Sequence, residues 1–245
     1  MIHTIAPQAA VIDVTHGIEP FNVLQGAVML ASALPYLPCG VHLAVVDPGV
    51  GGDRRGIALK DASGRLFVGP DNGLLMLAAD HAGRVDEAVE LEAVKPPAEH
   101  GSATFHARDV FAPTAARLAL GAALAELGAP VEPDSLRRLQ LPEPVPIGGG
   151  VEVGALAVDR FGNIALPVRF GKITEALAGG AACVVESTCG SVEAAVGRTF
   201  SSVAPGRAVI YANAFGYAEL AVREGSAAAV LGAVRGDAIR ISTKG

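Results

Sequence analysis

VHLAVVDPGVGGDRR, residues 41–55, sets an apolar run directly before an aspartate and a glycine-rich turn. The run His42–Val46 has the length and composition of a buried strand. It carries Asp47 to the carboxyl end of that strand, where open α/β sheets bind their ligands. Glycines let a backbone approach a ligand closely, and Arg54 follows them. The alternative is that Asp47 only organises a turn, because Asp-Pro-Gly is common turn chemistry.

The segments around this stretch alternate between strand-like and helix-like patterns. Strands are expected at Ala10–Val14, Gly56–Lys60 and Arg65–Val68, and helices after a cap at Asn22, from Asp71, and at Phe111–Leu120. Pro113 would lie in the first turn of the last helix, where proline is tolerated. Such alternation predicts an α/β layer with a central, mostly parallel sheet.

The composition changes at residues 141–150, LPEPVPIGGG, which have no periodicity and resemble a linker. Short strands are expected beyond it, at Val151–Val158, Ile164–Val168, Ala182–Glu186, Val192–Val196, Ala208–Ala212 and Ala218–Val222. Pro167 cannot donate to a ladder, so its strand should lie at an edge or a bulge there. We therefore expect an α/β domain over residues 1–146 and a small β-barrel domain over residues 147–245.

The composition excludes several classes of function. The 245 residues are 51% hydrophobic and 18% charged, which rules out general disorder. A net charge of −6 without a basic run is unfavourable for binding nucleic acid or anionic membranes. The mean hydropathy is +0.42, yet no stretch has the about 18 uninterrupted apolar residues of a membrane span. Three cysteines and no visible secretory signal favour a reduced, cytoplasmic protein.

Two further motifs carry groups suited to chemistry. In Thr104–Asp109, TFHARD, His106 precedes a predicted helix and could act as a base or an orienting group. The alternative is that Asp109 caps the helix and His106 has no role in chemistry. In Asp159–Asn163, DRFGN, an amide and an aromatic ring could hold a planar heterocycle, although a plain polar turn fits about as well. No compact spacing of metal ligands is found in the sequence, so we expect no metal site.

Six stretches together resemble the S-adenosyl-L-methionine hydrolases (SAM hydroxide adenosyltransferases), relatives of the SAM-dependent fluorinase and chlorinase. They are VIDVTHGIEPFNVLQGA, VHLAVVDPGVGGDRR, FVGPDNGLL, TFHARDVFAPTAARLALG, VDRFGNIALPV and YANAFGYAELAV, and they are spread over nearly the whole chain in the family's order. The resemblance implies an α/β domain followed by a β-barrel domain. It also implies a homotrimer with active sites between subunits.

The resemblance also implies roles for individual residues. The family's water-activating set corresponds here to Asp47, Arg54 and His106. The positions that hold the substrate correspond to Asp159, Phe161 and Asn163, with the asparagine on the adenine, and to Tyr211, Asn213 and Glu219. The family usually has Asn-Ser where this chain has Asn213-Ala214, so a hydroxyl contact is missing at that point. S-adenosyl-L-methionine would be the substrate, and no cofactor is expected.

The expected reaction is attack of water at C5′, which gives adenosine and L-methionine. A SAM-dependent halogenase is the first alternative, but a carboxylate at residue 47 would repel a halide at short range. A protein that binds SAM or adenosine without turnover is the second. It is motivated by a departure from the family, which normally opens with a strand near L-T-D-F-G that carries a ribose-binding aspartate. We expect that strand upstream of Met1, with its loss as the alternative.

Overall fold

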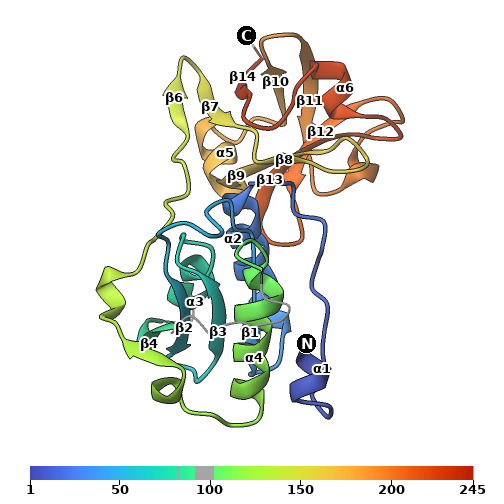
Figure 1. The fold of residues 1–245 in the computed structure, drawn as a ribbon. Coiled ribbons are helices and arrows are strands. Elements are labelled where there is room, and N and C mark those ends of the chain that lie inside the picture. Colours follow the sequence, from blue (N-terminus) through green and yellow to red (C-terminus); the bar gives the residue numbers. More distant parts are fainter. Residues whose placement is uncertain (82, 92–101, 245) are drawn as a thin grey trace. The chain divides into compact units, whose positions relative to one another are not determined.

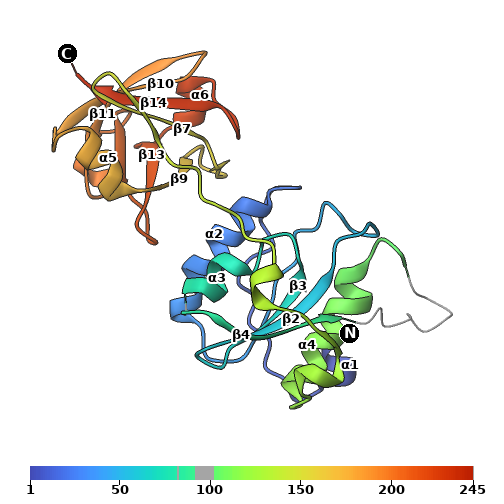
Figure 2. The same cartoon turned by 90° about the vertical axis from the view of Figure 1, so that its left-hand side faces the viewer.

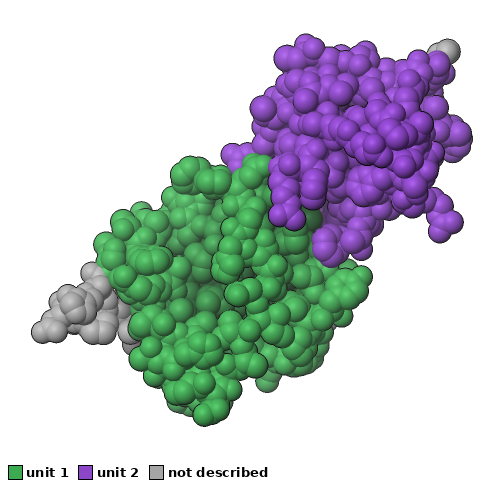
Figure 3. Space-filling view, turned by 90° about the vertical axis from the view of Figure 1, so that its right-hand side faces the viewer, with its two compact units in different colours: residues 1–139 green, residues 140–245 purple. Residues whose placement is uncertain are grey.

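The computed structural model describes residues 1–81, 83–91 and 102–244. The chain divides into two compact units, residues 1–139 and residues 140–245, which Figure 3 shows in green and purple. The boundary expected from composition, between residues 146 and 147, falls within strand β6 (Val145–Ile147) of the second unit. Among the described residues, no helix combines the length and apolar character needed to cross a membrane.

The first unit is built on a five-stranded sheet with the order β1-β3-β2-β4-β5. Its strands are β1 (Val41–Leu43), β2 (Gly56–Asp61), β3 (Leu66–Pro70), β4 (Val85–Leu91) and β5 (Gly128–Pro130). Its α-helices are α1 (Ile2–Ile5), α2 (Val23–Ala33), α3 (Met76–His81) and α4 (Ala112–Ala119), and short 3₁₀ turns lie at Leu34–Tyr36, Leu124–Glu126 and Pro133–Ser135.

The expected mostly parallel sheet is wrong for this unit. Among the described strands of the first unit only β1 and β3 pair in parallel, whereas β2 pairs with both β3 and β4 in antiparallel ladders. The reason is local, because β2 and β3 are joined by the turn at residues 62–65, which is too short for a parallel crossover. The unit is therefore α/β with a mixed sheet.

Helices cover both faces of this sheet, as Figures 1 and 2 show. Successive strand residues point to opposite faces, so Phe67 packs with α2 and α3 while Val68 packs with α4. Asn22 caps α2 as expected, since its side chain accepts a hydrogen bond from the Gln25 backbone N–H. Pro113 lies in the first turn of α4, also as expected.

The expected strand Ala10–Val14 is not formed. These residues are irregular, and the apolar side chains of Val11, Ile12 and Val14 are exposed. A strand needs a partner for its backbone groups, and no described strand forms a ladder with this stretch. Strand propensity alone was therefore insufficient here.

The second unit is a nine-stranded, mostly antiparallel sheet with the order β6-β7-β14-β10-β11-β12-β13-β9-β8. After β6 its strands are β7 (Gly150–Gly154), β8 (Ala157–Val158), β9 (Ile164–Arg169), β10 (Ala182–Glu186), β11 (Ser191–Val196), β12 (Ala208–Ala212), β13 (Tyr217–Val222) and β14 (Ala238–Thr243). Its helices are α5 (Phe170–Ala176) and α6 (Ala227–Leu231), with a 3₁₀ turn at Phe200–Ser202.

No ladder between described strands closes this sheet into the expected barrel. The sheet nonetheless encloses a core, because β7 and β9 both contribute buried residues to one cluster that includes Val153, Leu166 and Ile210. Pro167 lies where the β9–β13 register shifts, so the expected bulge is present. Strand β14, which the sequence analysis did not identify, supplies Ile239 and Ile241 to the same core.

Candidate active site

Asp47, Arg54 and His106 lie in contact in the first unit. The Arg54 Nε donates to both carboxylate oxygens of Asp47 at 3.0 and 2.9 Å, and its Nη2 lies 2.5 Å from Oδ2. The same Nη2 lies 2.7 Å from Nδ1 of His106. The three side chains predicted from separate motifs thus form one cluster, with the guanidinium in the middle.

Each member comes from a different segment of the first unit. Asp47 follows the extended residues after β1, where the Ala44 N–H bonds to the Val68 carbonyl of β3. A Cβ at Gly69 would collide with the Ala44 carbonyl oxygen, so glycine is required for this close approach. Arg54 stands two residues before β2, and His106 immediately precedes a π-helical turn, Ala107–Phe111, that leads into α4.

The cluster is largely shielded from solvent. The side chains of Arg54 and Asp47 are only 10% and 6% exposed. The guanidinium carbon of Arg54 lies 5.3 Å from the ring centroid of Phe111, which is fully buried. A cation over an aromatic face is attracted by the ring's quadrupole. Phe111 is therefore a supporting residue that the sequence motifs did not identify, although it was placed at the start of the helix.

The contact with Arg54 determines which ring nitrogen of His106 accepts a hydrogen bond. A guanidinium has donors only, so Nδ1 of the imidazole must accept the hydrogen bond. In this tautomer Nε2 carries the ring N–H. His106 thus presents an N–H donor on the side of the ring away from Arg54.

An open cleft of about 470 Å³ borders this cluster. It is lined by Gly52, Arg54, Arg55, Gly56, Glu90, Leu91, Ser102, Ala103, His106, Asp109 and Val110. Two members of the cluster, Arg54 and His106, therefore face a space that a small molecule or water can enter.

Asp109 does not cap helix α4. Its carboxylate accepts from the Arg108 Nε at 2.6 Å and from the Ser102 backbone N–H at 2.9 Å. These hydrogen bonds, the one from Arg108 foremost, lower the pKa of Asp109 to about 2. Asp109 therefore organises the loop around His106 as a carboxylate.

In the second unit Tyr211, Asn213 and Glu219 lie together. Tyr211 and Glu219 are directly opposite in the β12–β13 ladder, and the Tyr211 hydroxyl donates to Oε1 of Glu219. The Asn213 Nδ2 lies 3.3 Å from Oε2 of the same carboxylate. Burial, then the hydrogen bond to Glu219, and then the charges of Glu219 and Asp159 raise the pKa of Tyr211. The phenol stays protonated and acts as a donor.

Asp159, Phe161 and Asn163 form a second group of predicted site residues in this unit. The Asp159 carboxylate accepts from the backbone N–H groups of Phe161 and Asn163 and, at 2.9 Å, from the Asn163 side chain. Phe161 is 64% exposed, so its ring is available to a planar partner. One N–H of the buried Asn163 amide is thus already used by Asp159, while its carbonyl oxygen has no protein donor among the described hydrogen bonds.

Within the described residues, no three His, Cys, Asp or Glu side chains are placed to hold a metal ion.

Comparisons with known proteins place the chain in a family. Residues 1–128 match the SAM hydroxide adenosyltransferase N-terminal domain, and residues 154–240 match the C-terminal domain of the same family. An (R)-S-adenosyl-L-methionine hydrolase from Salinispora tropica is 47% identical over 97% of this chain and 88% of the relative. An (R)-S-adenosyl-L-methionine hydrolase from Thermus thermophilus is 42% identical over 96% of this chain and 89% of the relative. A fluorinase from an Actinoplanes species is 28% identical over 66% of this chain and 62% of the relative.

Two solved structures share the fold of this chain. An uncharacterised conserved protein from Thermotoga maritima superposes with a TM-score of 0.85 at 35% identity, covering 98% of this chain and 92% of the other. A conserved hypothetical protein from Thermus thermophilus gives 0.72 at 37% identity, with the same coverage of both chains. The family match spans both units, and it agrees with the motifs that carry the Asp47–Arg54–His106 cluster. The chain belongs to the SAM hydroxide adenosyltransferase family.

Proposed function

We propose that this protein hydrolyses S-adenosyl-L-methionine to adenosine and L-methionine, with the Asp47–Arg54–His106 cluster activating the water. The contact of these three side chains, which come from separate segments, is the observation that carries the residue assignment. The reaction itself is supported by hydrolases that are 42% and 47% identical over nearly the whole chain.

The chemistry determines what the site must supply. The water oxygen forms a bond to C5′ while the C5′–S bond breaks. The electron pair of the C5′–S bond goes to sulfur, which leaves as the neutral thioether of methionine. The leaving group therefore needs no general acid. Water is a weak nucleophile, so the barrier falls if its proton is accepted and the developing negative charge is stabilised.

The cluster has one group for each task. Asp47 is the carboxylate that accepts the proton, and the adjacent guanidinium of Arg54 stabilises hydroxide-like charge. The Nε2–H of His106 donates a hydrogen bond that orients the water. Shielding from bulk solvent, seen in the low exposure of Arg54 and Asp47, strengthens these interactions.

The second unit would hold the nucleoside and the amino acid. We assign Asn163 to the adenine edge, Phe161 to a face of a planar group, and Asp159 to the polar part of the substrate. Tyr211, Asn213 and Glu219 would complete the pocket. We also propose a cytoplasmic homotrimer with active sites between subunits, for which light scattering on the purified protein gives the mass directly.

Incubation with SAM in ¹⁸O-labelled water tests the reaction. Equal amounts of adenosine and methionine are expected, with the label in adenosine, because attack occurs at C5′. The same incubation with chloride or bromide should give no 5′-halogenated nucleoside. A halogenated product at a comparable rate would establish the halogenase alternative, and binding of SAM without any product would establish a binding protein.

A further inference from the structure

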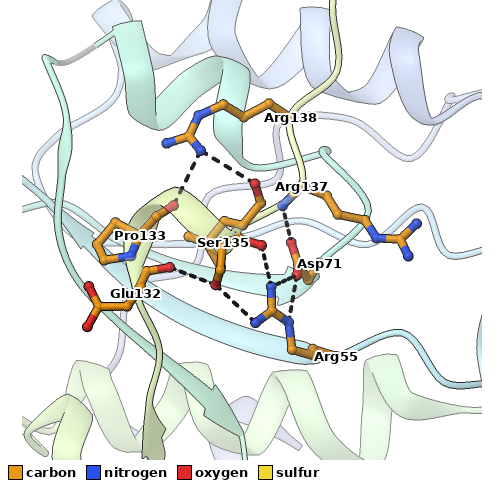
Figure 4. A network of polar contacts seen from close by, with 8 residues as sticks. Arg55, Asp71, Glu132, Pro133, Ser135, Arg137 and Arg138 are labelled. Carbon is orange, nitrogen blue, oxygen red and sulfur yellow. Dashed lines mark hydrogen bonds and ion pairs between the residues drawn. The ribbon is translucent and has the colours of Figure 1, made fainter.

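The loop after strand β3 carries two polar residues, Asp71 and Asn72, behind the cluster. The Asp71 side chain is 2% exposed, and its Oδ2 accepts from Arg55 Nε at 2.9 Å and Nη2 at 2.6 Å. Its backbone N–H donates to the Arg55 carbonyl at 2.9 Å. Figure 4 shows the carboxylate between the Arg55 guanidinium and the backbone nitrogen of Arg137, which it also accepts from.

Arg54 and Arg55 lie on opposite faces of the sheet. Arg54 points to the α4 face, where it contacts His106 and Phe111. Arg55 points to the other face, where it also bonds to Ser135. Consecutive residues at the start of a strand alternate in this way. Asp71 bonds to both the side chain and the backbone carbonyl of Arg55. Asp71 therefore restrains the backbone from which Arg54 projects.

Asn72 contacts the segment that carries Asp47, the partner of Arg54 in the ion pair. Its Nδ2 donates to the Val46 carbonyl at 2.8 Å, and its Oδ1 accepts from the Leu74 N–H at 3.1 Å. Both ends of the amide are thus used by backbone groups, which defines its orientation. Val46 immediately precedes Asp47, so Asn72 limits the movement of the peptide that carries the carboxylate.

We propose that Asp71 and Asn72 are positioning residues for the Asp47–Arg54–His106 cluster. Each acts through the neighbour of a cluster member, Asp71 through Arg55 and Asn72 through Val46. The proposal rests on the proposed function, since it assigns these residues to the same site. A purely structural reading would have Asp71 only anchor the segment at residues 131–139, through Arg137 and Ser135.

Steady-state kinetics of three variants separate the two readings. Asp71→Asn removes the charged acceptor, Arg55→Lys removes its bidentate partner, and Asn72→Ser removes the donor to Val46. Each should lower kcat by about 10–100-fold, because small displacements of catalytic groups are costly. KM should stay within about threefold of the wild type, because none of the three residues is assigned to the substrate.

A matched control and a double variant sharpen the test. Asp80→Asn is the same chemical change in the same network, but Asp80 bonds to the exposed Arg138 instead, so kcat should not change. Asp71→Asn combined with Arg55→Lys should lose no more activity than the worse single variant, since both break one link.

A second readout is the ¹⁵N resonance of His106 Nδ1, assigned with a His106→Gln variant. It should shift in Asp71→Asn, Arg55→Lys and Asn72→Ser and stay unchanged in Asp80→Asn, because displacement of Arg54 or of its partner Asp47 alters the hydrogen bond at that nitrogen. If the wild type turns over no SAM, the proposed function fails and this resonance alone decides the positioning.

The proposal is overturned if the variants lose thermal stability while kcat and the resonance both match those of Asp80→Asn. It is also overturned if KM rises and kcat does not change. If Asp71→Asn does not fold, Arg55→Lys tests the Asp71–Arg55 contact in its place. Arg55 is partly exposed and the lysine keeps the positive charge, so this variant should fold.

Discussion

The polar clusters of the two units are assembled over very different distances in the sequence. In the first unit Arg54 and His106 are 52 positions apart and meet only because the β-sheet and helix α4 are packed together. In the second unit Tyr211 and Glu219 are eight positions apart, and Asp159 and Asn163 only four. The first cluster depends on tertiary packing, whereas the second is organised by a hairpin and a turn.

This difference predicts different responses to substitution. In a cluster whose side chains are positioned by residues distant in the sequence, displacing one of those residues should lower kcat with little effect on substrate binding. Groups held by their own turn should show local effects on binding or on the stability of that unit.

Asp47→Asn keeps the shape of the side chain but removes the proposed base. We expect kcat to fall by about 10²–10⁴-fold, the usual contribution of a positioned base, with SAM affinity level or slightly improved. Initial rates over a range of SAM concentrations measure both quantities. If KM rises and kcat holds, Asp47 is a binding or capping residue and the mechanism is wrong.

Asn163→Ala should have the opposite pattern. It removes a contact expected on the adenine and weakens substrate and transition state together, so KM rises with little loss of kcat. Loss of one hydrogen bond of about 1.4 kcal/mol corresponds to about a tenfold change. Adenosine binding by calorimetry should weaken by a similar factor. Unchanged adenosine affinity would remove Asn163 from the nucleoside pocket.

Tyr211→Phe removes the donor to Glu219 with almost no change of shape. Because Tyr211 is only 7% exposed and its acceptor is charged, we expect a loss of about 1.5–3 kcal/mol from the free energy of unfolding of the second unit. Urea denaturation gives the value. A loss well below 1 kcal/mol, on the scale of an exposed pair, would show that the hydrogen bond is replaced by water.

The smallest effect should come from His42, a buried residue of the first unit whose Nε2 has no hydrogen-bond partner among the described residues. Burial and the charge of Arg65 lower its pKa, against a smaller opposite effect of Asp61. The unfolded chain then binds more protons than the folded chain just below pH 6.5, so stability falls as pH falls through that range. His42→Gln should flatten this part of the stability–pH curve. An unchanged curve would assign the slope to other groups.

Local elements were predicted well wherever local chemistry decides them. The Asn22 cap, the strands β10 and β12, and the bulge at Pro167 follow from residues close in the chain. The strand expected at Ala10–Val14 failed because a strand also needs a partner, which a propensity does not describe. The sheet direction in the first unit failed for a related reason, since alternation of elements does not state which strands pair.

The sequence by itself predicted which residues would carry chemistry, because Asp47, Arg54 and His106 each sit in a motif that resembles the family's. Only the tertiary structure decided that they touch, that Arg54 lies between the other two, and that His106 accepts rather than donates at Nδ1. It also brought Asp71 and Asn72 behind the cluster. The physical reason is that motifs report local backbone preferences, whereas the meeting of distant side chains depends on how sheet and helices pack.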